Sequence, residues 1–366
     1  MLYPAQLCGN RTDMAKDKIV IVGGYGAVGS SITKWLSSWY PGRVVVAGRS
    51  LRKAKALQQS LEQNVEVLQL DIHHIEEDAF LDDAALLIMC IDQPSAALAE
   101  HCIAKGVHYM DISATPSVIQ GIESLQEQAI AQRVSLLLSV GLAPGLTNLL
   151  AKWVTHSNPG RKVLQLFVLL GLGEDHGDQA FQWTFDHLHE QYRIRERGND
   201  GLVKSFTQPI ATDLLGNRKF YLFNFSDQQV LARTQDLYSV STRMAFDHKG
   251  VTALLAGLRK LGLTRLMRQP WLQRIMIKLF RKIRMGTDVF AVKARSQSAE
   301  GVWTEASVSG HGEGEITALV AALLARDVLD KAPGRFGVQH IDTYIADVPA
   351  FMKQLQQYQP ALIIVL

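Results

Sequence analysis

The chain has 366 residues, of which 47% are hydrophobic and 20% are charged. These values are typical of a folded globular protein, and the length favours two domains over a single core. The formal net charge of +3 is too small to indicate nucleic-acid binding, and three widely spaced cysteines (Cys8, Cys90 and Cys102) exclude a disulfide framework and indicate a reducing, cytoplasmic compartment.

Residues 1–17 predict a flexible tail before the folded part of the chain. They contain no sustained apolar run of the kind found in signal peptides, and Met14 is an alternative start. No run of about 18 apolar residues follows, so no transmembrane helix is predicted.

Strand and helix patterns alternate in the first third of the chain. Apolar, β-branched runs predict strands at 18–22, 43–47, 65–70, 84–91, 109–112 and 135–140, and helical patterns lie between them at 30–38, 51–63, 95–105 and 117–132. This alternation is typical of a doubly wound parallel sheet, the Rossmann type of α/β fold, with helices on both faces.

A glycine loop directly follows the first of these strands. It reads Gly24-Tyr25-Gly26-Ala27-Val28-Gly29, the G-x-G-x-x-G pattern of dinucleotide-binding sites. Gly24 would permit a tight turn, Gly26 would let the backbone approach a pyrophosphate, and Gly29 would let the next helix pack closely on the strand. The strand before the loop and the helix behind it favour a dinucleotide site over an ordinary turn, because the helix N-terminus attracts phosphates.

The end of the second predicted strand decides between NAD and NADP. NAD enzymes usually carry an acidic residue there, which binds the ribose hydroxyls. This chain instead has Arg49, Ser50 and Arg52, followed by Lys53. Because arginine can hold a 2′-phosphate with two hydrogen bonds, we expect NADP as the cofactor, with NAD as the alternative. The competing interpretation, a solvated helix start, leaves the missing acid unexplained.

Polar residues at the ends of later strands are candidates for the rest of the cofactor site. Asp71 would approach the adenine side of the cofactor or cap the next turn, and Asp92 would contact the cofactor or cap the following helix. Pro94 would direct that loop along the nicotinamide ribose. Asp111 would face the nicotinamide end as a catalytic residue, or would serve as a turn acid. Asn148 is interpreted first as a helix cap and second as a cofactor contact.

A turn containing proline and glycine, at 139–148, predicts the hinge into a second domain. Beyond it we expect a helix at 149–155, strands at 163–172, 219–224, 289–296 and 304–309, and a helix at 315–329. This order favours an α+β substrate and dimerisation domain built on an antiparallel or mixed sheet. We therefore place the Rossmann domain at 18–147 and the second domain at 148–366, with a late segment, about 315–345, that packs back on the first.

The candidate substrate site lies in the segment 171–184. His176 could move a proton while hydride is transferred at the adjacent carbon, Asp178 could orient it, and Trp183 could form a wall of the pocket. The alternative is an ordinary helix start with an aspartate cap. Hydride transfer needs neither a metal nor a protein nucleophile, so no metal site is predicted.

A basic stretch from 249 to 287 contains ten Lys and Arg residues and no acidic residue. Within it, 271–284 predicts an amphipathic helix whose apolar positions are Leu272, Ile275, Met276, Leu279, Phe280 and Ile283. Such a helix could lie on an anionic membrane surface as a peripheral contact. It could instead pack on the second domain or a partner subunit, or form a funnel for an anionic ligand.

Several segments together resemble the saccharopine dehydrogenase-like family, specifically the two-domain NADP enzymes of the saccharopine reductase type. They are the glycine loop, Ala47-Gly48-Arg49-Ser50, Gly106-Val107-His108-Tyr109-Met110-Asp111, Gly141-Leu142-Ala143-Pro144-Gly145 and Pro333-Gly334-Arg335-Phe336-Gly337-Val338. The resemblance implies a Rossmann domain followed by a substrate and dimerisation domain, with a late segment that returns to the first. It also implies NADP and a redox reaction at a carbon–nitrogen bond of an amino-acid-like substrate.

We therefore predict a cytoplasmic, homodimeric, NADP-dependent oxidoreductase that transfers hydride at a C–N or C=N centre of an amino-acid-like small molecule. One alternative is an NADPH-dependent reductase of a lipid, enoyl or acyl intermediate at a membrane surface, which the basic helix would reach. Another is an NADP-binding sensor or interaction protein without turnover.

Overall fold

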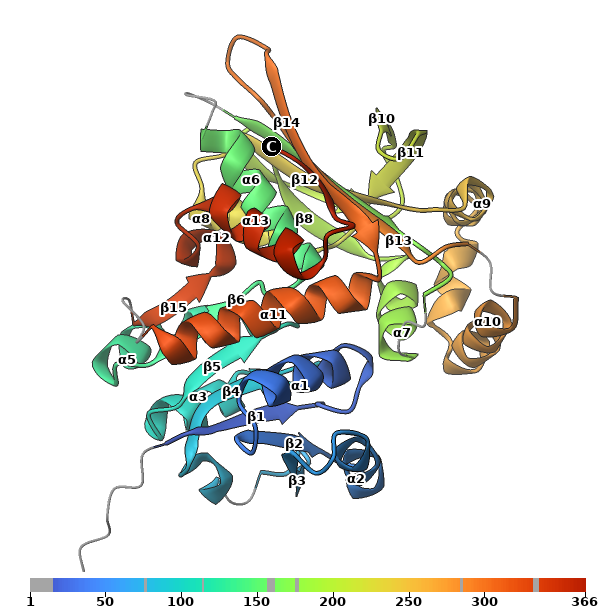
Figure 1. Cartoon of the computed structure of the whole chain (residues 1–366). Helices are drawn as coiled ribbons and strands as arrows, with labels where there is room; N and C mark the ends of the chain where they lie inside the picture. Colours follow the sequence, from blue (N-terminus) through green and yellow to red (C-terminus); the bar gives the residue numbers. More distant parts are fainter. Residues whose placement is uncertain are drawn as a thin grey trace, which may run out of the picture.

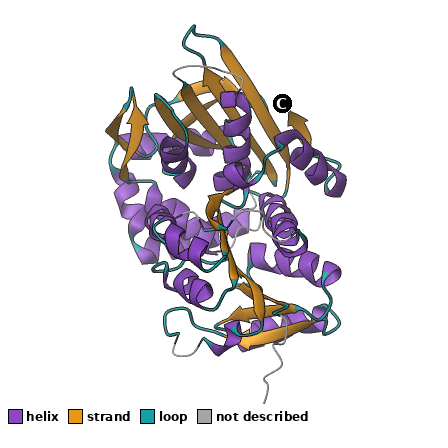
Figure 2. Ribbon diagram, turned by 90° about the vertical axis from the view of Figure 1, so that its left-hand side faces the viewer, coloured by secondary structure: helices purple, strands orange, loops and turns teal. Residues whose placement is uncertain are grey.

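Two large β-sheets, with helices between and around them, make up the chain (Figures 1 and 2). The computed structural model describes residues 16–75, 78–113, 115–156, 162–174, 178–283, 286–331 and 336–366, without the side chains of 178–181, 277 and 279–283. Within these residues, no helix is both long and apolar enough to cross a bilayer.

The first sheet is parallel and has the strand order β15-β6-β5-β4-β1-β2-β3. Its strands are β1 (Lys18–Val22), β2 (Val44–Gly48), β3 (Val65–Gln69), β4 (Ala84–Met89), β5 (His108–Asp111), β6 (Ser135–Leu138) and β15 (Gly337–His340). Apolar residues fill both faces of β1, β2 and β4, as a sheet covered on both sides requires. The predicted doubly wound α/β class is confirmed, and the order matches that of dinucleotide-binding sheets.

Helices of the first domain follow the strands in alternation. They are α1 (Ala27–Trp39), α2 (Leu51–Ser60), α3 (Ala97–Ala104), α4 (Pro116–Glu123) and α5 (Gln126–Ala131), with a short 3₁₀ turn η1 (Ala79–Leu81). The single helix predicted at 117–132 is wrong. The chain breaks at Ser124, whose hydroxyl donates to the carbonyl of Gly121 at 2.6 Å, and the break lets Leu125 enter the core.

The second sheet is mixed and has the order β10-β11-β12-β7-β13-β14-β16. Its strands are β7 (Val163–Leu170), β10 (Ile210–Asp213), β11 (Asn217–Leu222), β12 (Ser239–Phe246), β13 (Val289–Gln297), β14 (Trp303–His311) and β16 (Ile363–Val365), and a separate hairpin joins β8 (Gln191–Glu196) to β9 (Asn199–Lys204). Only β7 and β12 run parallel. The sequence patterns missed β12, because Ser, Thr and Arg interrupt its apolar residues.

Helices of the second half surround this sheet and connect it to the first. After the irregular turn η2 (Leu142–Leu146) come α6 (Thr147–His156), α7 (Asp178–His187), α8 (Ser226–Thr234), α9 (Lys249–Lys260), the 3₁₀ helix η3 (Leu263–Arg268), α10 (Pro270–Ile283), α11 (Glu313–Asp330), α12 (Ile341–Tyr344) and α13 (Val348–Tyr358). Helices α7, α9 and α10 gather at one end of the molecule, on the right in Figure 1.

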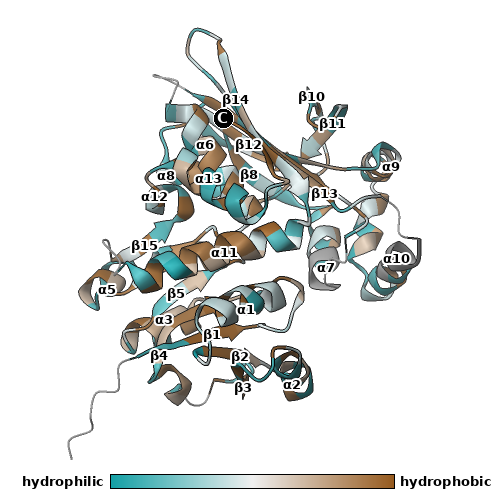
Figure 3. Ribbon diagram, in the orientation of Figure 1, coloured by the Kyte–Doolittle hydropathy of each residue, from teal (hydrophilic) through white to brown (hydrophobic). Residues whose placement is uncertain are grey.

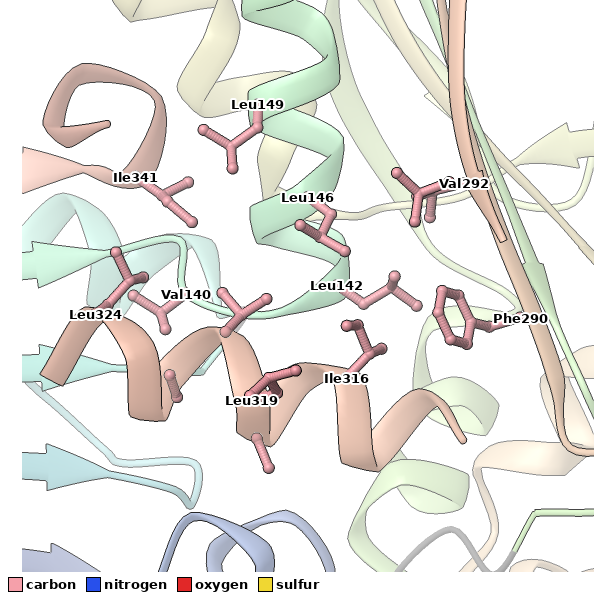
Figure 4. Close-up of a cluster of buried hydrophobic side chains, with 14 of the residues drawn as sticks. Val140, Leu142, Leu146, Leu149, Phe290, Val292, Ile316, Leu319, Leu324 and Ile341 are labelled. Carbon is pink, nitrogen blue, oxygen red and sulfur yellow. The ribbon is translucent and has the colours of Figure 1, made fainter. Parts of the chain in front are cut away.

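Helix α11 lies between the two sheets and packs on α1. It is mostly apolar along its length (Figure 3), and Ile316, Leu319 and Leu324 are almost fully buried. Figure 4 shows these side chains in one cluster with Val140 and Leu142 of the first domain and Phe290 of the second. After α11 the chain adds β15 to the first sheet, where Val338 pairs with Leu136. The domain boundary drawn at residue 147 remains a prediction.

Candidate functional site

The glycine loop connects β1 to α1 with its backbone closely packed. The residue with positive φ (80°) is Gly23, one position before the glycine that we expected to make the turn. A Cβ on Gly24 would lie 2.9 Å from the carbonyl oxygen of Ile21, and a Cβ on Gly29 would lie 2.2 Å from that of Gly23. Gly26 is exposed, and its added Cβ would meet only the Gly23 oxygen, at 3.1 Å. Thus Gly24 and Gly29 serve the fold, while Gly26 is open to a ligand.

Tyr25 links this loop to the end of β2. Its phenolic oxygen accepts a hydrogen bond of 2.9 Å from the backbone nitrogen of Ser50. Its ring covers Gly48, where an added Cβ would lie 2.6 Å from that same oxygen. The tyrosine therefore connects the glycine loop, which we assigned to the pyrophosphate, to the loop after β2, which we assigned to the ribose.

The basic residues beyond β2 surround the start of α2. The Ser50 hydroxyl accepts from the backbone nitrogen of Lys53 and caps the helix, while Arg49, Arg52 and Lys53 are exposed. The first turn of α2 contains no acid. Cations at a helix N-terminus are unfavourable by themselves, so an anion bound among them would stabilise the turn. These residues fit the 2′-phosphate of NADP.

The other strand-end candidates separate into two groups. Asp92 lines the cavity described below, and its carboxylate accepts from the Thr115 hydroxyl at 3.2 Å. Asp71 accepts from the backbone nitrogen of His73 at 3.1 Å, which is the turn-capping alternative. Pro94 is exposed and does not line the cavity, which corrects its expected position beside the nicotinamide ribose; the neighbouring Gln93 is buried against Asp111.

Asp111 is buried and does not line the cavity, so its expected position facing the nicotinamide end is wrong. The residue is 1% exposed, and its carboxylate accepts from the amide of Gln93 (2.6 Å), the hydroxyl of Tyr109 (2.8 Å) and the backbone nitrogen of Ser113 (2.6 Å). Burial raises the pKa of Asp111, although these hydrogen bonds oppose the shift. This geometry is that of a turn acid, and Ile112 and Ser113 line the cavity in its place.

Asn148 is fully buried and supports the irregular turn η2. Its Oδ1 accepts from the backbone nitrogen of Gly145 at 3.0 Å, so the side chain holds the turn that precedes α6 and does not make the expected cap contact to the helix. It does not line the cavity. His176 lies outside the described residues, as does the side chain of Asp178, so their predicted roles stay predictions.

A cavity of about 330 Å³ lies where the two domains meet. On the first-domain side its walls are the glycine loop and the ends of β4, β5 and β6, including Val140 to Pro144. These are the carboxyl ends of parallel strands, where ligands of this fold class bind. On the opposite side it is closed by residues after β7 and by α7, α9 and the first turn of α11.

The second-domain side of the cavity is apolar. Its lining side chains there include Leu170, Leu172, Trp183, Phe185, Leu188, Phe225, Phe246, Val251 and Leu255. Among the described lining residues none is Lys, Arg or His, whereas Asp92, Glu174 and Glu313 are acidic. The Glu174 carboxylate accepts from the backbone nitrogens of Glu313 (2.6 Å) and Gly314 (2.7 Å) and caps α11.

Sequence reasoning missed most of this apolar lining. Of the nine side chains, only Trp183 was singled out, because a leucine that faces a cavity has the same pattern as one in a solid core. Cys90 also lines the cavity. Burial raises the pKa of its thiol, with the charge of Asp111 adding to the shift, so it is not activated as a nucleophile.

Comparison with known proteins agrees with this geometry. Residues 19–137 match the family described as the saccharopine dehydrogenase NADP binding domain. No curated protein sequence matches the chain significantly. Apo saccharopine dehydrogenase (L-Glu forming) from Saccharomyces cerevisiae is 12% identical and has a TM-score of 0.63, with 96% of this chain and all of that chain (100%) covered. A meso-dapdh variant from Clostridium tetani is 14% identical, with a TM-score of 0.41 over 93% of this chain and 99% of the other.

The match over 19–137 covers the glycine loop, the basic turn after β2 and the ends of β4 and β5. NADP is therefore the cofactor of the first domain, and the overall fold is that of saccharopine dehydrogenase. The first domain is therefore similar to the NADP-binding domain of saccharopine dehydrogenases, and the whole chain shares the fold of the yeast enzyme.

Proposed function

We propose that this protein is an NADPH-dependent reductase whose substrate is an apolar molecule with a reducible enoyl or carbonyl group, such as an acyl-chain derivative. One observation carries the proposal: nine apolar side chains form the second-domain side of the cavity, and no basic residue lies among its described lining residues. The volume of about 330 Å³ is at the small end of the range for ligand sites. It suits a reacting group with a short length of chain.

The charge of the lining argues against an anionic reacting end. A carboxylate buried in this cavity would lose its water without gaining a cationic partner among the described residues, and Asp92 would repel it. An apolar chain gains about 0.8 kcal/mol for each methylene that it buries. The walls formed by Trp183, Phe225 and Phe246 therefore favour an apolar substrate.

When bound, NADPH supplies the hydride, and the protein orients the substrate and excludes water. Ser113, Thr184 and Thr317 provide the neutral hydroxyls of the lining. Ser113 follows β5 by two residues, and it is the one of the three that comes from the nicotinamide end of the first sheet. A hydroxyl of this kind can donate to a substrate carbonyl or to a carboxamide, so Ser113 is the polar group that we expect to orient the reacting end.

A second candidate keeps the amino-acid-like substrate that the family resemblance implies. The observation that favours it is the carboxylate of Asp92 in the cavity, which could hold a substrate ammonium. This candidate requires basic residues for the substrate carboxylates, and those would have to come from outside the described lining. Reaction at a C–N centre is therefore the competing proposal.

NADPH oxidation, followed by the loss of its absorbance, discriminates between the candidates. The panel contains 2-enones and enoyl thioesters of increasing chain length, aldehydes, and pairs of a 2-oxo acid with an amine. Turnover that improves with chain length supports the proposal. Turnover restricted to the oxo-acid and amine pairs contradicts it and supports the second candidate. Tight NADPH binding with no turnover on any member would favour a sensor without catalysis.

A further inference from the structure

A basic and apolar surface lies beside the interdomain cavity, and the cofactor site does not use it. The surface is formed by α9, η3, the start of α10 and the β8–β9 hairpin, and we call it the α9–α10 face. Six large apolar side chains on it are 45% to 73% exposed: Leu254, Leu261, Leu263, Leu266, Trp271 and Ile275. They fall within 22 consecutive residues, 254–275, of the basic stretch recognised in the sequence.

A concave basic pocket adjoins these apolar residues. It is lined by Lys204, Arg259, Arg265 and Arg268, together with His189, Gln191 and one acid, Glu190. The Glu190 carboxylate already accepts from the amide of Asn224 at 2.9 Å. Four cations therefore surround one hollow that contains a single, already engaged carboxylate.

Contacts at the base of the pocket hold part of this positive charge in place. Arg259 is 9% exposed, and its Nε donates to the carbonyl of Ser205 at 2.9 Å. Arg268 donates from Nε to the carbonyl of Asp186 at 3.1 Å. Lys204 and Arg265 are exposed at the rim. Burial lowers the pKa of His189, and the surrounding arginines and Lys204 lower it further, which favours the neutral form of the histidine beside the four cations.

Helix α9 connects the two features. Val251 and Leu255 line the interdomain cavity, Leu254 is 61% exposed, and Arg259 lines the basic pocket. Helix α10 packs against α7, which also lines the cavity. An apolar substrate that reached the α9–α10 face would therefore already be at a wall of the cavity.

We propose that the α9–α10 face docks the protein on an anionic lipid surface, with phosphate headgroups in the basic pocket and Leu261, Leu266 and Trp271 in the outer acyl region. Charge complementarity favours an anionic lipid surface as the partner, because the stretch 249–287 contains no acidic residue. Exposed leucines beside basic residues are typical of segments that bind at a membrane interface. A tryptophan at the edge is suited to the headgroup level. The inference rests on the proposed function, because a docked protein would take its apolar substrate from the lipid.

Vesicle flotation of the full-length chain tests the proposal. We expect the protein to float with vesicles that contain phosphatidylserine and to stay behind with phosphatidylcholine alone. Reversing two rim charges, Lys204→Glu with Arg265→Glu, should weaken this binding about tenfold or more, because each basic residue near an anionic surface contributes measurably. Leu266→Ser with Trp271→Ser should weaken it as well. All four positions are exposed, so folding should be preserved.

Matched controls lie on other surfaces of the molecule. Lys353→Glu on α13 reverses an exposed charge, and Ile130→Ser on α5 removes an apolar side chain that is 44% exposed. Both variants should float like the parent. No flotation of the parent, or equal losses in the controls, would overturn the proposal. So would a change in oligomeric state of the α9–α10 variants by light scattering, which would assign the face to a second copy of this chain.

Two further measurements separate this inference from the proposed function. If inorganic phosphate raises the melting temperature through the basic pocket while no vesicle is bound, the pocket serves a soluble anion and the docking proposal fails. Turnover of a short, water-soluble enone without vesicles should be equal in the parent and in the α9–α10 variants. Docking without any turnover would refute the proposed function alone, and turnover without docking would refute this inference alone.

Discussion

The hydroxyl oxygen of Ser139 lies 2.8 Å from Nδ1 of His340, 201 residues further along the chain. The other ring nitrogen of His340 lies 3.0 Å from a carboxylate oxygen of Glu123, which also accepts from Arg233 at 2.6 Å. This chain of contacts joins the end of β6 to β15, α4 and α8. Because Ser139 directly precedes the segment 140–144 that lines the cavity, the late part of the chain helps to position the site.

Removing the charge of Glu123, which contacts both His340 and Arg233, should destabilise the fold at neutral pH. Burial alone would raise the pKa of Glu123, but hydrogen bonds from His340 and Arg233 bring it below its usual value. A carboxylate with a lowered folded-state pKa stabilises the fold above its unfolded pKa, and this stabilisation is lost as the pH falls through the folded-state value. Glu123→Gln should therefore cost about 1–2 kcal/mol at pH 7.

The difference between Glu123→Gln and the parent should shrink as the pH falls below about 4.3, the ordinary glutamate pKa. Urea unfolding at several pH values measures this. The matched control is Glu127→Gln, an exposed position near the same helix break. A loss that is the same at every pH would show that packing, and not the charge of Glu123, stabilises the contact.

Two glycines of the same loop should separate folding from cofactor binding. Gly29→Ala places a Cβ 2.2 Å from the Gly23 oxygen and should reduce stability by about 2 kcal/mol or more, as other strained core insertions do. Gly26→Ala meets only one atom, at 3.1 Å, and should lower stability by less than about 1 kcal/mol while weakening NADPH binding. Thermal unfolding and NADPH titration check both. Normal NADPH affinity in Gly26→Ala would contradict the role of this backbone in holding the pyrophosphate.

Arg49 should distinguish the two nicotinamide cofactors. Its charge lies at the end of β2 beside the Ser50 cap, and a charge-assisted contact to a 2′-phosphate contributes about 1.5–3 kcal/mol. Arg49→Asp should therefore weaken NADPH binding about tenfold to a hundredfold, and NADH binding much less. Lys34→Asp, on the exposed side of α1, controls for the change in net charge. Equal losses for NADPH and NADH would refute the 2′-phosphate assignment.

Neighbouring leucines on α9 offer a test of the cavity. Leu255 lines it and is 5% exposed, whereas Leu254 is 61% exposed. Leu255→Phe should fill part of the space and reduce kcat/KM for longer enones about tenfold, the effect of losing room for one or two methylenes. Shorter enones should be nearly unaffected. Leu254→Phe should leave the chain-length preference for soluble substrates unchanged, and a similar shift in both variants would show that the cavity does not hold the chain.

Local patterns predicted most of the first domain. Strand β1 was predicted with its observed bounds. The glycine loop identified a dinucleotide site, and the presence of Arg49 where NAD enzymes carry an acidic residue indicated a preference for NADP. These features depend on residues next to one another in the chain. Strand β15 was not predicted, because Gly337-Val338-Gln339-His340 has no strand pattern of its own and pairs only when the edge of β6 is available.

Side-chain direction was the property that the sequence could not supply. Asp111 follows a strand at the expected edge of the sheet, yet Gln93, Tyr109 and Ser113 enclose its carboxylate. In the same way, the amphipathic pattern of α10 did not show that Met276 packs on the core while Trp271 and Ile275 remain exposed.

By itself, the sequence determined the fold class, the dinucleotide loop and the cofactor, because these follow from short spacings and from charge at one turn. Only the tertiary structure decided that the second-domain side of the cavity is apolar, that Asp111 does not line the cavity and that the α9–α10 face adjoins it. Those properties arise where segments from β4 to α11 meet, and burial depends on partners that are distant in the chain.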